Sequence, residues 1–296
     1  MSYTRHPAEG NTRRVAITGA SRGLGRVLLD HFRQSGWEAH GIARSGADHL
    51  ADVTDPEQVA RAMQAICAPA DGPAGLDVLV CCASRAIGGR LMDLPRDEAL
   101  AAIQTDLAGT ITAVQCAQPY LRLRPVATVV LINSFAAFSG IPGFASYSAA
   151  KAAINAYAQA LRLEWEQQGP DVLQVFVGSL TQDSETQRPA WNSAGRTYLR
   201  SMRPLRLFNS ASLPIPPEAV ANRIARALGR SEDVFVPRGL FWMEALSRHL
   251  PALFRVMVRT FYRRRVPEML GETNAASSLP RDHQAWPDNR PDSPAR

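Results

Sequence analysis

Two side chains one helical turn apart, Tyr147 and Lys151, could do acid–base chemistry together. Lys151 is the single lysine of the 296-residue chain, in which every other long cationic side chain is an arginine. A position that keeps lysine in such a chain needs a compact ammonium with rotatable donors and a movable pKa. On a helix that ammonium lies close enough to Tyr147 to lower the pKa of its phenol. The pair is either an acid–base device or a buried tyrosine beside a lysine that escaped the compositional bias.

A glycine-rich segment, Gly19 to Gly25, lies between a strand predicted at residues 13–18 and a helix predicted at residues 26–35. In such a unit, backbone N–H groups and the positive end of the helix bind the pyrophosphate of a dinucleotide. Gly19, Gly23 and Gly25 are spaced more widely than the common G-x-G-x-x-G pattern. The position between strand and helix therefore supports the prediction more than the glycines themselves do.

Two arginines predict which dinucleotide is bound. Arg44 follows the second predicted strand, residues 38–43, where a NAD site usually carries an acidic group for the ribose 2′-hydroxyl. Arg22 lies inside the glycine loop, and both guanidinium groups suit a 2′-phosphate, so we predict NADPH. Asp52, in a third predicted strand at residues 50–53, is a candidate acceptor for the adenine amino group. The alternative is that both arginines are ordinary solvated side chains.

Strands and helices alternate along the first 240 residues, which predicts an α/β fold. We expect a Rossmann-like, doubly wound parallel sheet of about seven strands with helices on both faces. Ligands bind such sheets at the carboxyl ends of the strands. Ser84 and Ser134 follow the fourth and fifth predicted strands, so they should face one crevice with the glycine loop. Further strands are predicted at residues 77–82, 126–133, 172–177 and 234–237, and helices at 96–120, 147–168, 217–228 and from Pro56, with Asp55 as N-cap.

The bulk composition excludes few classes of function. The net charge of +6 permits contact with nucleic acid or an anionic membrane, and it equally fits a polyphosphate cofactor. Zinc-finger spacing and aromatic–basic interleaving do not occur, so we expect no nucleic-acid partner. The four cysteines resemble buried thiols more than a bridge, which predicts a reducing, cytoplasmic location. No signal-peptide pattern is found, and no apolar run reaches the roughly 18 residues that a membrane span needs.

Together these motifs resemble the short-chain dehydrogenases and reductases of the single-domain kind, over about residues 13 to 237. Thr18-Gly19-Ala20-Ser21-Arg22-Gly23-Leu24-Gly25 is similar to the family's T-G-x-x-x-G-x-G, Asp52-Val53 to its adenine-contacting D-V, and Ser134 with Tyr147 and Lys151 to its catalytic serine and Y-x-x-x-K. The resemblance implies that Tyr147 protonates a carbonyl oxygen as hydride arrives and that Ser134 hydrogen-bonds this oxygen. It implies that Lys151 holds the nicotinamide ribose and lowers the pKa of Tyr147. It also implies cofactor contacts from Gly19, Ser21, Arg22, Gly23, Leu24, Gly25, Arg44, Asp52, Val53, Ala83, Tyr147, Lys151, Gly178 and Thr181.

Three departures from the family pattern mark a specialised member. The family's asparagine in x-N-L-x-G is here Asp106, which makes Asp106 a further candidate catalytic residue. That asparagine helps to hold a water in a proton relay to the lysine, so the carboxylate could preserve, retune or break the relay, or oppose the effect of Lys151 on Tyr147. The family's N-N-A-G appears as Cys81-Cys82-Ala83-Ser84, and its P-G after the sixth strand as Val177-Gly178. Gln182 replaces a threonine that commonly touches the nicotinamide amide, and the adjacent Thr181 is a candidate substitute.

Around the Rossmann domain of residues 13–240, other segments have different composition. We expect a flexible N-terminus at residues 1–12, a substrate-binding loop or lid at 181–217 and a disordered tail at 266–296. Residues 241–265 predict an amphipathic helical extension, restarted at Pro251, with Arg248, Arg255, Arg259 and Arg263 on one side. This extension either packs on the pocket or a partner subunit, or lies on an anionic membrane, and we favour packing.

Two functions are compatible with these residues. The first is an NADPH-dependent oxidoreductase that reduces a carbonyl, or oxidises the corresponding alcohol, of a lipophilic or polyketide-like substrate. The second is an NADP(H)-binding scaffold or sensor with little redox turnover, held at a membrane surface, as the changes at Asp106, Ser84 and Gln182 would allow. The resemblance also implies a homodimer or homotetramer.

Overall fold

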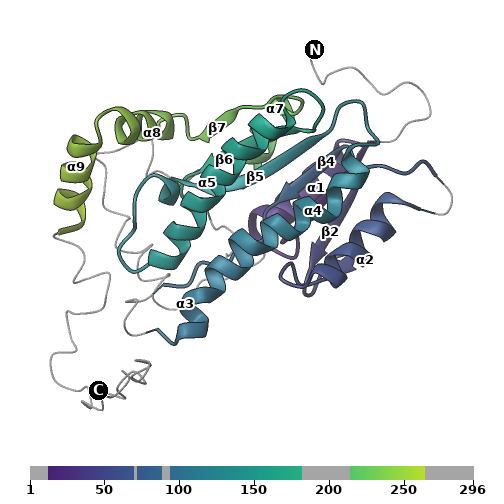
Figure 1. The fold of residues 1–296 in the computed structure, drawn as a ribbon, viewed down its shortest axis with the longest axis horizontal. Helices are drawn as coiled ribbons and strands as arrows, with labels where there is room; N and C mark the ends of the chain where they lie inside the picture. The colour runs from purple at the N-terminus through teal and green to yellow at the C-terminus, as the bar shows by residue number, and fades with distance from the viewer. Residues whose placement is uncertain (1–12, 70–71, 89–93, 182–213, 264–296) are drawn as a thin grey trace, which may run out of the picture.

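A parallel β-sheet of seven strands forms the centre of the molecule in the computed structural model, which describes residues 13–69, 72–88, 94–181 and 214–263 (Figure 1). Its order, β3-β2-β1-β4-β5-β6-β7, reverses direction between β1 and β4, so the doubly wound, Rossmann-like prediction is confirmed. The predicted flexible N-terminus, the predicted C-terminal tail and residues 182–213 of the predicted substrate loop lie outside the described residues. The strands are β1 (Arg14–Thr18), β2 (Glu38–Ala43), β3 (His49–Leu50), β4 (Val78–Cys81), β5 (Thr128–Ser134), β6 (Asp171–Val177) and β7 (Asp233–Val236).

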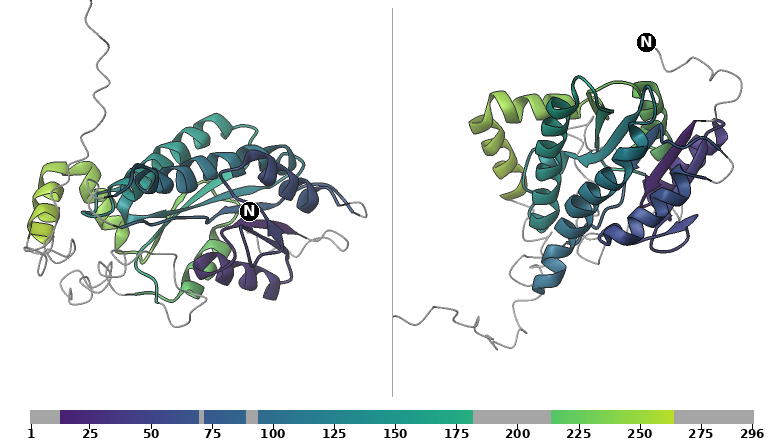
Figure 2. Two further views of the ribbon diagram at one scale, coloured as in Figure 1. Left: turned by 90° about the horizontal axis from the view of Figure 1, so that it is seen from below. Right: turned by 45° about the vertical axis from the view of Figure 1, so that its right-hand side comes forward.

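Helices cover both faces of the sheet, as Figure 2 shows. On one face, α1 (Gly23–Gln34) and α7 (Pro217–Ala227) bury an apolar stripe that includes Leu28 and Phe32. The opposite face is covered by α2 (Pro56–Cys67), α4 (Gly109–Leu121) and α5 (Ala145–Trp165). Successive side chains along each strand point into alternate layers: in β1, Val15 and Ile17 pack in the first layer and Ala16 in the second. Full burial of each large apolar side chain contributes about 1.5–3 kcal/mol, so the two layers fix the sheet that positions the loops.

The third strand ends earlier than the sequence predicts. β3 pairs with β2 only through His49 and Leu50, and residues 51–53 form the loop that follows. Asp52 explains this, because its carboxylate accepts hydrogen bonds from the backbone N–H (3.0 Å) and the hydroxyl (2.8 Å) of Thr54. The chain thereby turns into α2, whose predicted N-cap is confirmed: Asp55 accepts hydrogen bonds from two backbone N–H groups, both at 3.0 Å. This turn brings Asp52 and Val53 to the carboxyl edge of the sheet.

The helix predicted at residues 96–120 is not a uniform α-helix. It consists of α3 (Arg96–Ala102), a π-helical segment, η2 (Ile103–Ala108), and α4. The π-helical turn carries Asp106, which is fully buried. The spacing of apolar residues in the flanking sequence does not predict this burial. Gly109 follows directly, and a Cβ there would come within 2.6 Å of Val53 Cγ2. The helix can therefore approach the β3–α2 loop only because this residue is glycine.

The C-terminal extension consists of two helices, α8 (Leu240–His249) and α9 (Pro251–Arg263), beyond the edge strand β7 (Figure 1). The helix restarts at Pro251 as predicted, so Arg248 lies on α8 and the other three arginines of the predicted row lie on α9. Proline disfavours helical backbone in the residue before it, which explains the break. Among the described residues, no helix combines the length and the apolar character needed to cross a membrane.

Candidate active site

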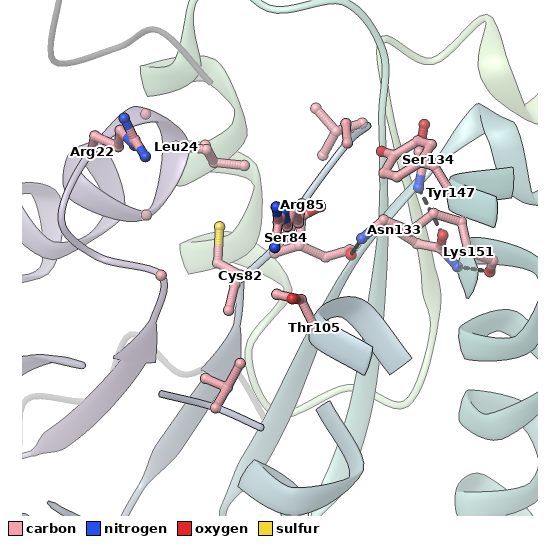
Figure 3. A pocket seen from close by; sticks show the side chains of 18 of the residues that line it. Arg22, Leu24, Cys82, Ser84, Arg85, Thr105, Asn133, Ser134, Tyr147 and Lys151 are labelled. Atoms are coloured by element: carbon pink, nitrogen blue, oxygen red, sulfur yellow. Dashed lines mark hydrogen bonds between the residues drawn. The ribbon is translucent and has the colours of Figure 1, made fainter. Parts of the chain in front are cut away.

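A cavity of about 720 Å³ opens at the carboxyl ends of the strands, where the sheet order reverses between β1 and β4. Figure 3 shows Arg22 and Leu24 on one side of it, Ser134, Tyr147 and Lys151 on the other, and Ser84 and Arg85 between them. The loops after β1, β2, β4, β5 and β6 and the start of α5 therefore meet in one place. Residues of the predicted cofactor site that line the cavity are Gly19, Ser21, Arg22, Gly23, Leu24, Gly25, Arg44, Asp52, Val53, Ala83, Tyr147, Lys151 and Gly178.

The glycine loop brings its backbone very close to the neighbouring chain. Gly19 has φ +71°, and a Cβ on it would lie 2.6 Å from the Cα of Ala83. Gly25 sits so close to the carbonyl of Gly19 that no side chain fits there. Thr18 fastens the same junction, because its hydroxyl oxygen accepts hydrogen bonds from the N–H groups of Cys82 (3.1 Å) and Ala83 (3.2 Å). Gly19 and Gly25 must therefore be glycine, because neighbouring backbone lies too close for a side chain. The loop leaves the backbone N–H groups at the start of α1 facing the cavity.

Arg22 and Arg44 lie exposed along the same end of the cavity. They come from two different loops, one before α1 and one after β2. Neither arginine forms an ion pair with a carboxylate of the described residues. Two such guanidinium groups beside a glycine-rich helix start could hold the phosphate of a phosphorylated ribose.

Ser134, Tyr147 and Lys151 form the opposite end. Ser134 closes β5, Tyr147 lies in the first turn of α5, and Lys151 follows one turn later on the same face. The ammonium of Lys151 lies 5.5 Å from the centre of the Tyr147 ring and donates a hydrogen bond to the carbonyl of Ile132 (3.2 Å). Ser134 interacts with the Tyr147 hydroxyl through its side chain. The structure therefore brings together Ser134, Tyr147 and Lys151, three of the four candidate catalytic residues.

Asp106 stands directly behind this group without lining the cavity. Its Oδ2 lies 3.1 Å from Lys151 Nζ and accepts a 2.6 Å hydrogen bond from the Ser84 hydroxyl, while Oδ1 accepts one of 2.7 Å from the Arg85 N–H. The side chains of Asp106 and Lys151 are 0% and 5% exposed, so water screens their attraction very little. The carboxylate thus neutralises the lysine and fixes the loop after β4 at once.

These neighbours set the pKa values of the site. Burial raises the pKa of Tyr147 most strongly, and the charge of Asp106 raises it further. The charge of Lys151 and a hydrogen bond with Ser134 lower this pKa, but the net result stays above the ordinary value for tyrosine. The expected effect of Lys151 on the phenol is therefore present but outweighed, because the burial of the ring disfavours the charged phenolate. Burial alone would lower the pKa of Lys151, yet Asp106 and Tyr147 together raise it. Tyr147 is consequently a protonated acid, beside a lysine held in its charged form.

Sequence reasoning missed one positioning residue. Asn133, a polar residue inside the apolar strand β5, donates hydrogen bonds to the Lys151 carbonyl (3.2 Å) and to Gln174 Oε1 (3.0 Å). The side-chain oxygen of Asn133, Oδ1, accepts a hydrogen bond from the Ser134 N–H (2.8 Å), so Asn133 links Ser134 to Lys151. A buried amide in a strand of this kind is the signal that could have revealed it. Thr181 is not among the residues that line the cavity, and its N–H donates a hydrogen bond to the Ile215 carbonyl (2.9 Å). Gln182 lies outside the described residues.

The residues that line the cavity suit a dinucleotide cofactor. One end has a glycine loop too close to neighbouring backbone for any side chain, the N–H groups of a helix start, and two exposed arginines. A lysine, a serine and a tyrosine hydroxyl stand at the other. Both ends open into the same space, which is large enough for a ligand of this class.

Comparisons with known proteins identify the family of the chain. The sequence model of the short chain dehydrogenase family matches residues 13–193. A 3-ketodihydrosphingosine reductase of Bacteroides thetaiotaomicron is 29% identical over 51% of this chain and 57% of its own length. An NADPH-dependent 1-acyldihydroxyacetone phosphate reductase of Saccharomyces cerevisiae is 25% identical over 77% and 82%. A short-chain dehydrogenase structure from Streptomyces avermitilis superposes with a TM-score of 0.68 at 24% identity, covering 87% of this chain and 98% of its own. The chain therefore belongs to the short chain dehydrogenase family of oxidoreductases.

Proposed function

We propose that the protein is an NADPH-dependent carbonyl reductase, which in the reverse direction oxidises the corresponding secondary alcohol. One observation carries the proposal. Arg22 and Arg44 lie exposed at the glycine-loop end of the cavity and form no ion pair with a carboxylate of the described residues, while Ser134, Tyr147 and Lys151 lie at its other end. A 2′-phosphate explains the first feature and a reacting carbonyl the second.

Each residue has a definite task in this reaction. The nicotinamide cofactor, when bound, supplies the hydride that adds to the carbonyl carbon. Tyr147 donates its phenolic proton to the carbonyl oxygen, and its raised pKa keeps that proton available at neutral pH. Ser134 donates a hydrogen bond to the same oxygen and so orients the carbonyl. Lys151 stabilises the phenolate that forms, and Asp106 limits how strongly it does so.

We propose a lipophilic substrate. The catalytic end of the cavity is walled by apolar side chains, among them Ile87, Phe135, Ile141 and Phe144. Apolar walls of this kind select for apolar ligand surface, with the serine and tyrosine as the few polar groups that orient it. The names of the two relatives, a 3-ketodihydrosphingosine reductase and a 1-acyldihydroxyacetone phosphate reductase, support the same substrate class.

NADPH oxidation with a panel of ketones of increasing chain length tests this function. We expect turnover that rises with the apolar length of the ketone. Tyr147→Phe should reduce kcat about 10²- to 10⁴-fold, because general acid catalysis contributes that much. The mutant lacks one hydroxyl and keeps the ring, so its cofactor affinity serves as the control for an intact site. Full activity in Tyr147→Phe would contradict the mechanism.

One observation favours the second candidate, an NADP(H)-binding protein with little turnover. The Asp106 carboxylate pairs with the only lysine of the chain and so opposes its effect on Tyr147. Calorimetry separates the two functions: tight NADPH binding without turnover of any ketone would favour the binding protein. We prefer the enzyme, because the serine, tyrosine and lysine are assembled in one cavity.

A further inference from the structure

The two C-terminal helices expose an unusual share of the large apolar side chains. Nine such side chains are strongly exposed in the described part of the chain, and five of them lie between Phe241 and Val256. Single exposed apolar residues are ordinary on protein surfaces, but a concentration of this kind marks a contact site. The five are Phe241 (46% exposed), Trp242 (72%), Leu250 (55%), Leu253 (55%) and Val256 (61%).

Helix α9 has two distinct faces. Phe254, Val258 and Tyr262, at i, i+4 and i+8, form the inner face, where Phe254 and Tyr262 are buried. Tyr262 belongs to an apolar cluster with Ile141 and Phe144, which line the cavity, and Val258 packs against the same cluster. The predicted packing on the pocket therefore accounts for this side. Leu253 and Val256 point the opposite way on a helix of 3.6 residues per turn. Packing on the pocket therefore leaves the exposure of Leu253 and Val256 unexplained.

A row of positively charged side chains lies next to Leu253 and Val256 on α9. Arg255, Arg259 and Arg263 follow one another at i, i+4 and i+8, and all three are exposed. From Arg238 to Arg263 the chain has five arginines and a single carboxylate, Glu244, which is already paired with Arg248 at 3.2 Å. The outer face of α9, defined here as Leu253, Val256 and the three arginines, is therefore both apolar and cationic.

We propose that the outer face of α9 binds the surface of an anionic phospholipid bilayer. The apolar side chains would enter the boundary between head groups and acyl chains, while the arginines would contact lipid phosphates. A second copy of the chain is a poorer occupant, because it would bring the same arginine row against itself. If the substrate is lipophilic, which rests on the proposed function, α9 would place the cavity next to the phase in which that substrate dissolves.

Vesicle sedimentation with the full chain tests the proposal without any catalytic readout. We expect binding to vesicles of phosphatidylcholine mixed with phosphatidylglycerol, weakened by salt, and little binding to phosphatidylcholine alone. Changing Arg255, Arg259 and Arg263 together to Gln should weaken binding about a hundredfold, since each arginine near an anionic surface contributes a several-fold factor. Leu253→Glu with Val256→Glu should weaken it by more than about tenfold.

Leu163→Glu is the matched control, because Leu163 is 76% exposed on α5, far along the chain from the C-terminal helices. It should bind vesicles as the wild type does, and circular dichroism should show all variants folded. Failure of the wild type to bind anionic vesicles would overturn the proposal, as would equal losses in Leu163→Glu and the α9 variants. Light scattering tests the competing occupant. An oligomer that the Leu253→Glu and Val256→Glu changes dissociate, with vesicle binding unaltered, would assign the face to a second copy instead.

Discussion

The two ends of the cavity are built in different ways. At the glycine loop, the site consists of backbone held close to backbone, with Arg22 and Arg44 exposed at its rim and free to meet a ligand charge. At the catalytic end, the charges are buried and satisfied by one another before any ligand arrives, since Asp106 pairs with Lys151 and with Ser84. The difference shows which changes alter only cofactor affinity and which also alter the stability of the fold.

The catalytic end should respond most strongly to substitution. Lys151→Met leaves Asp106 as an uncompensated buried carboxylate, so the free energy of unfolding should fall by about 3–5 kcal/mol, as measured by urea denaturation without cofactor. Lys151→Met combined with Asp106→Leu removes both charges and should recover much of that loss. If Lys151→Met alone were as stable as the wild type, Lys151 and Asp106 would not form the buried ion pair seen in the structure.

The glycine loop should respond through cofactor affinity. Gly25→Val forces a side chain against the Gly19 carbonyl, so the loop must move its backbone N–H groups from the position in which they face the cavity. NADPH affinity measured by calorimetry should therefore fall roughly a hundredfold, a loss of about 3 kcal/mol of binding free energy. Gly140→Ala provides the control, because a Cβ there meets open space. Equal affinities in the Gly25→Val variant and the wild type would remove the close-approach explanation of the loop.

The rim arginines should have the smallest effect, and a selective one. Arg44→Ala removes one charge-assisted contact, so NADPH affinity should fall about tenfold while NADH affinity hardly changes. Arg61→Ala, an exposed arginine on α2 outside the cavity, should leave both affinities unaltered. Parallel losses for the two cofactors in Arg44→Ala would contradict the 2′-phosphate assignment.

Much of this site could be predicted from the sequence because its signals are local. The glycine loop follows its strand directly, and Tyr147 and Lys151 are one turn apart, so short-range rules suffice. The strand order and the meeting of Ser134 with the glycine loop follow from the general behaviour of alternating strands and helices.

The parts that sequence reasoning could not supply depend on contacts between distant segments. The π-helical turn that buries Asp106 against Lys151 joins residues 45 positions apart, and no periodic pattern announces it. The net pKa of Tyr147 required the burial of the ring and two opposing charges to be known together. Likewise, the inner face of α9 is set by a contact between distant segments, because Tyr262 joins the apolar cluster of Ile141 and Phe144 and Val258 packs against it.

The pH dependence of alcohol oxidation in the wild type and in Asp106→Asn tests the central claim, that Tyr147 is the proton-transferring group and is held between Lys151 and Asp106. Oxidation requires the phenolate, so its rate rises with pH as Tyr147 loses its proton. Asp106 raises the pKa of Tyr147, and its replacement leaves the lowering effect of Lys151 less opposed. We therefore predict that the rising limb of the profile moves to lower pH in Asp106→Asn. A limb that stays in place, or moves to higher pH, would contradict the account.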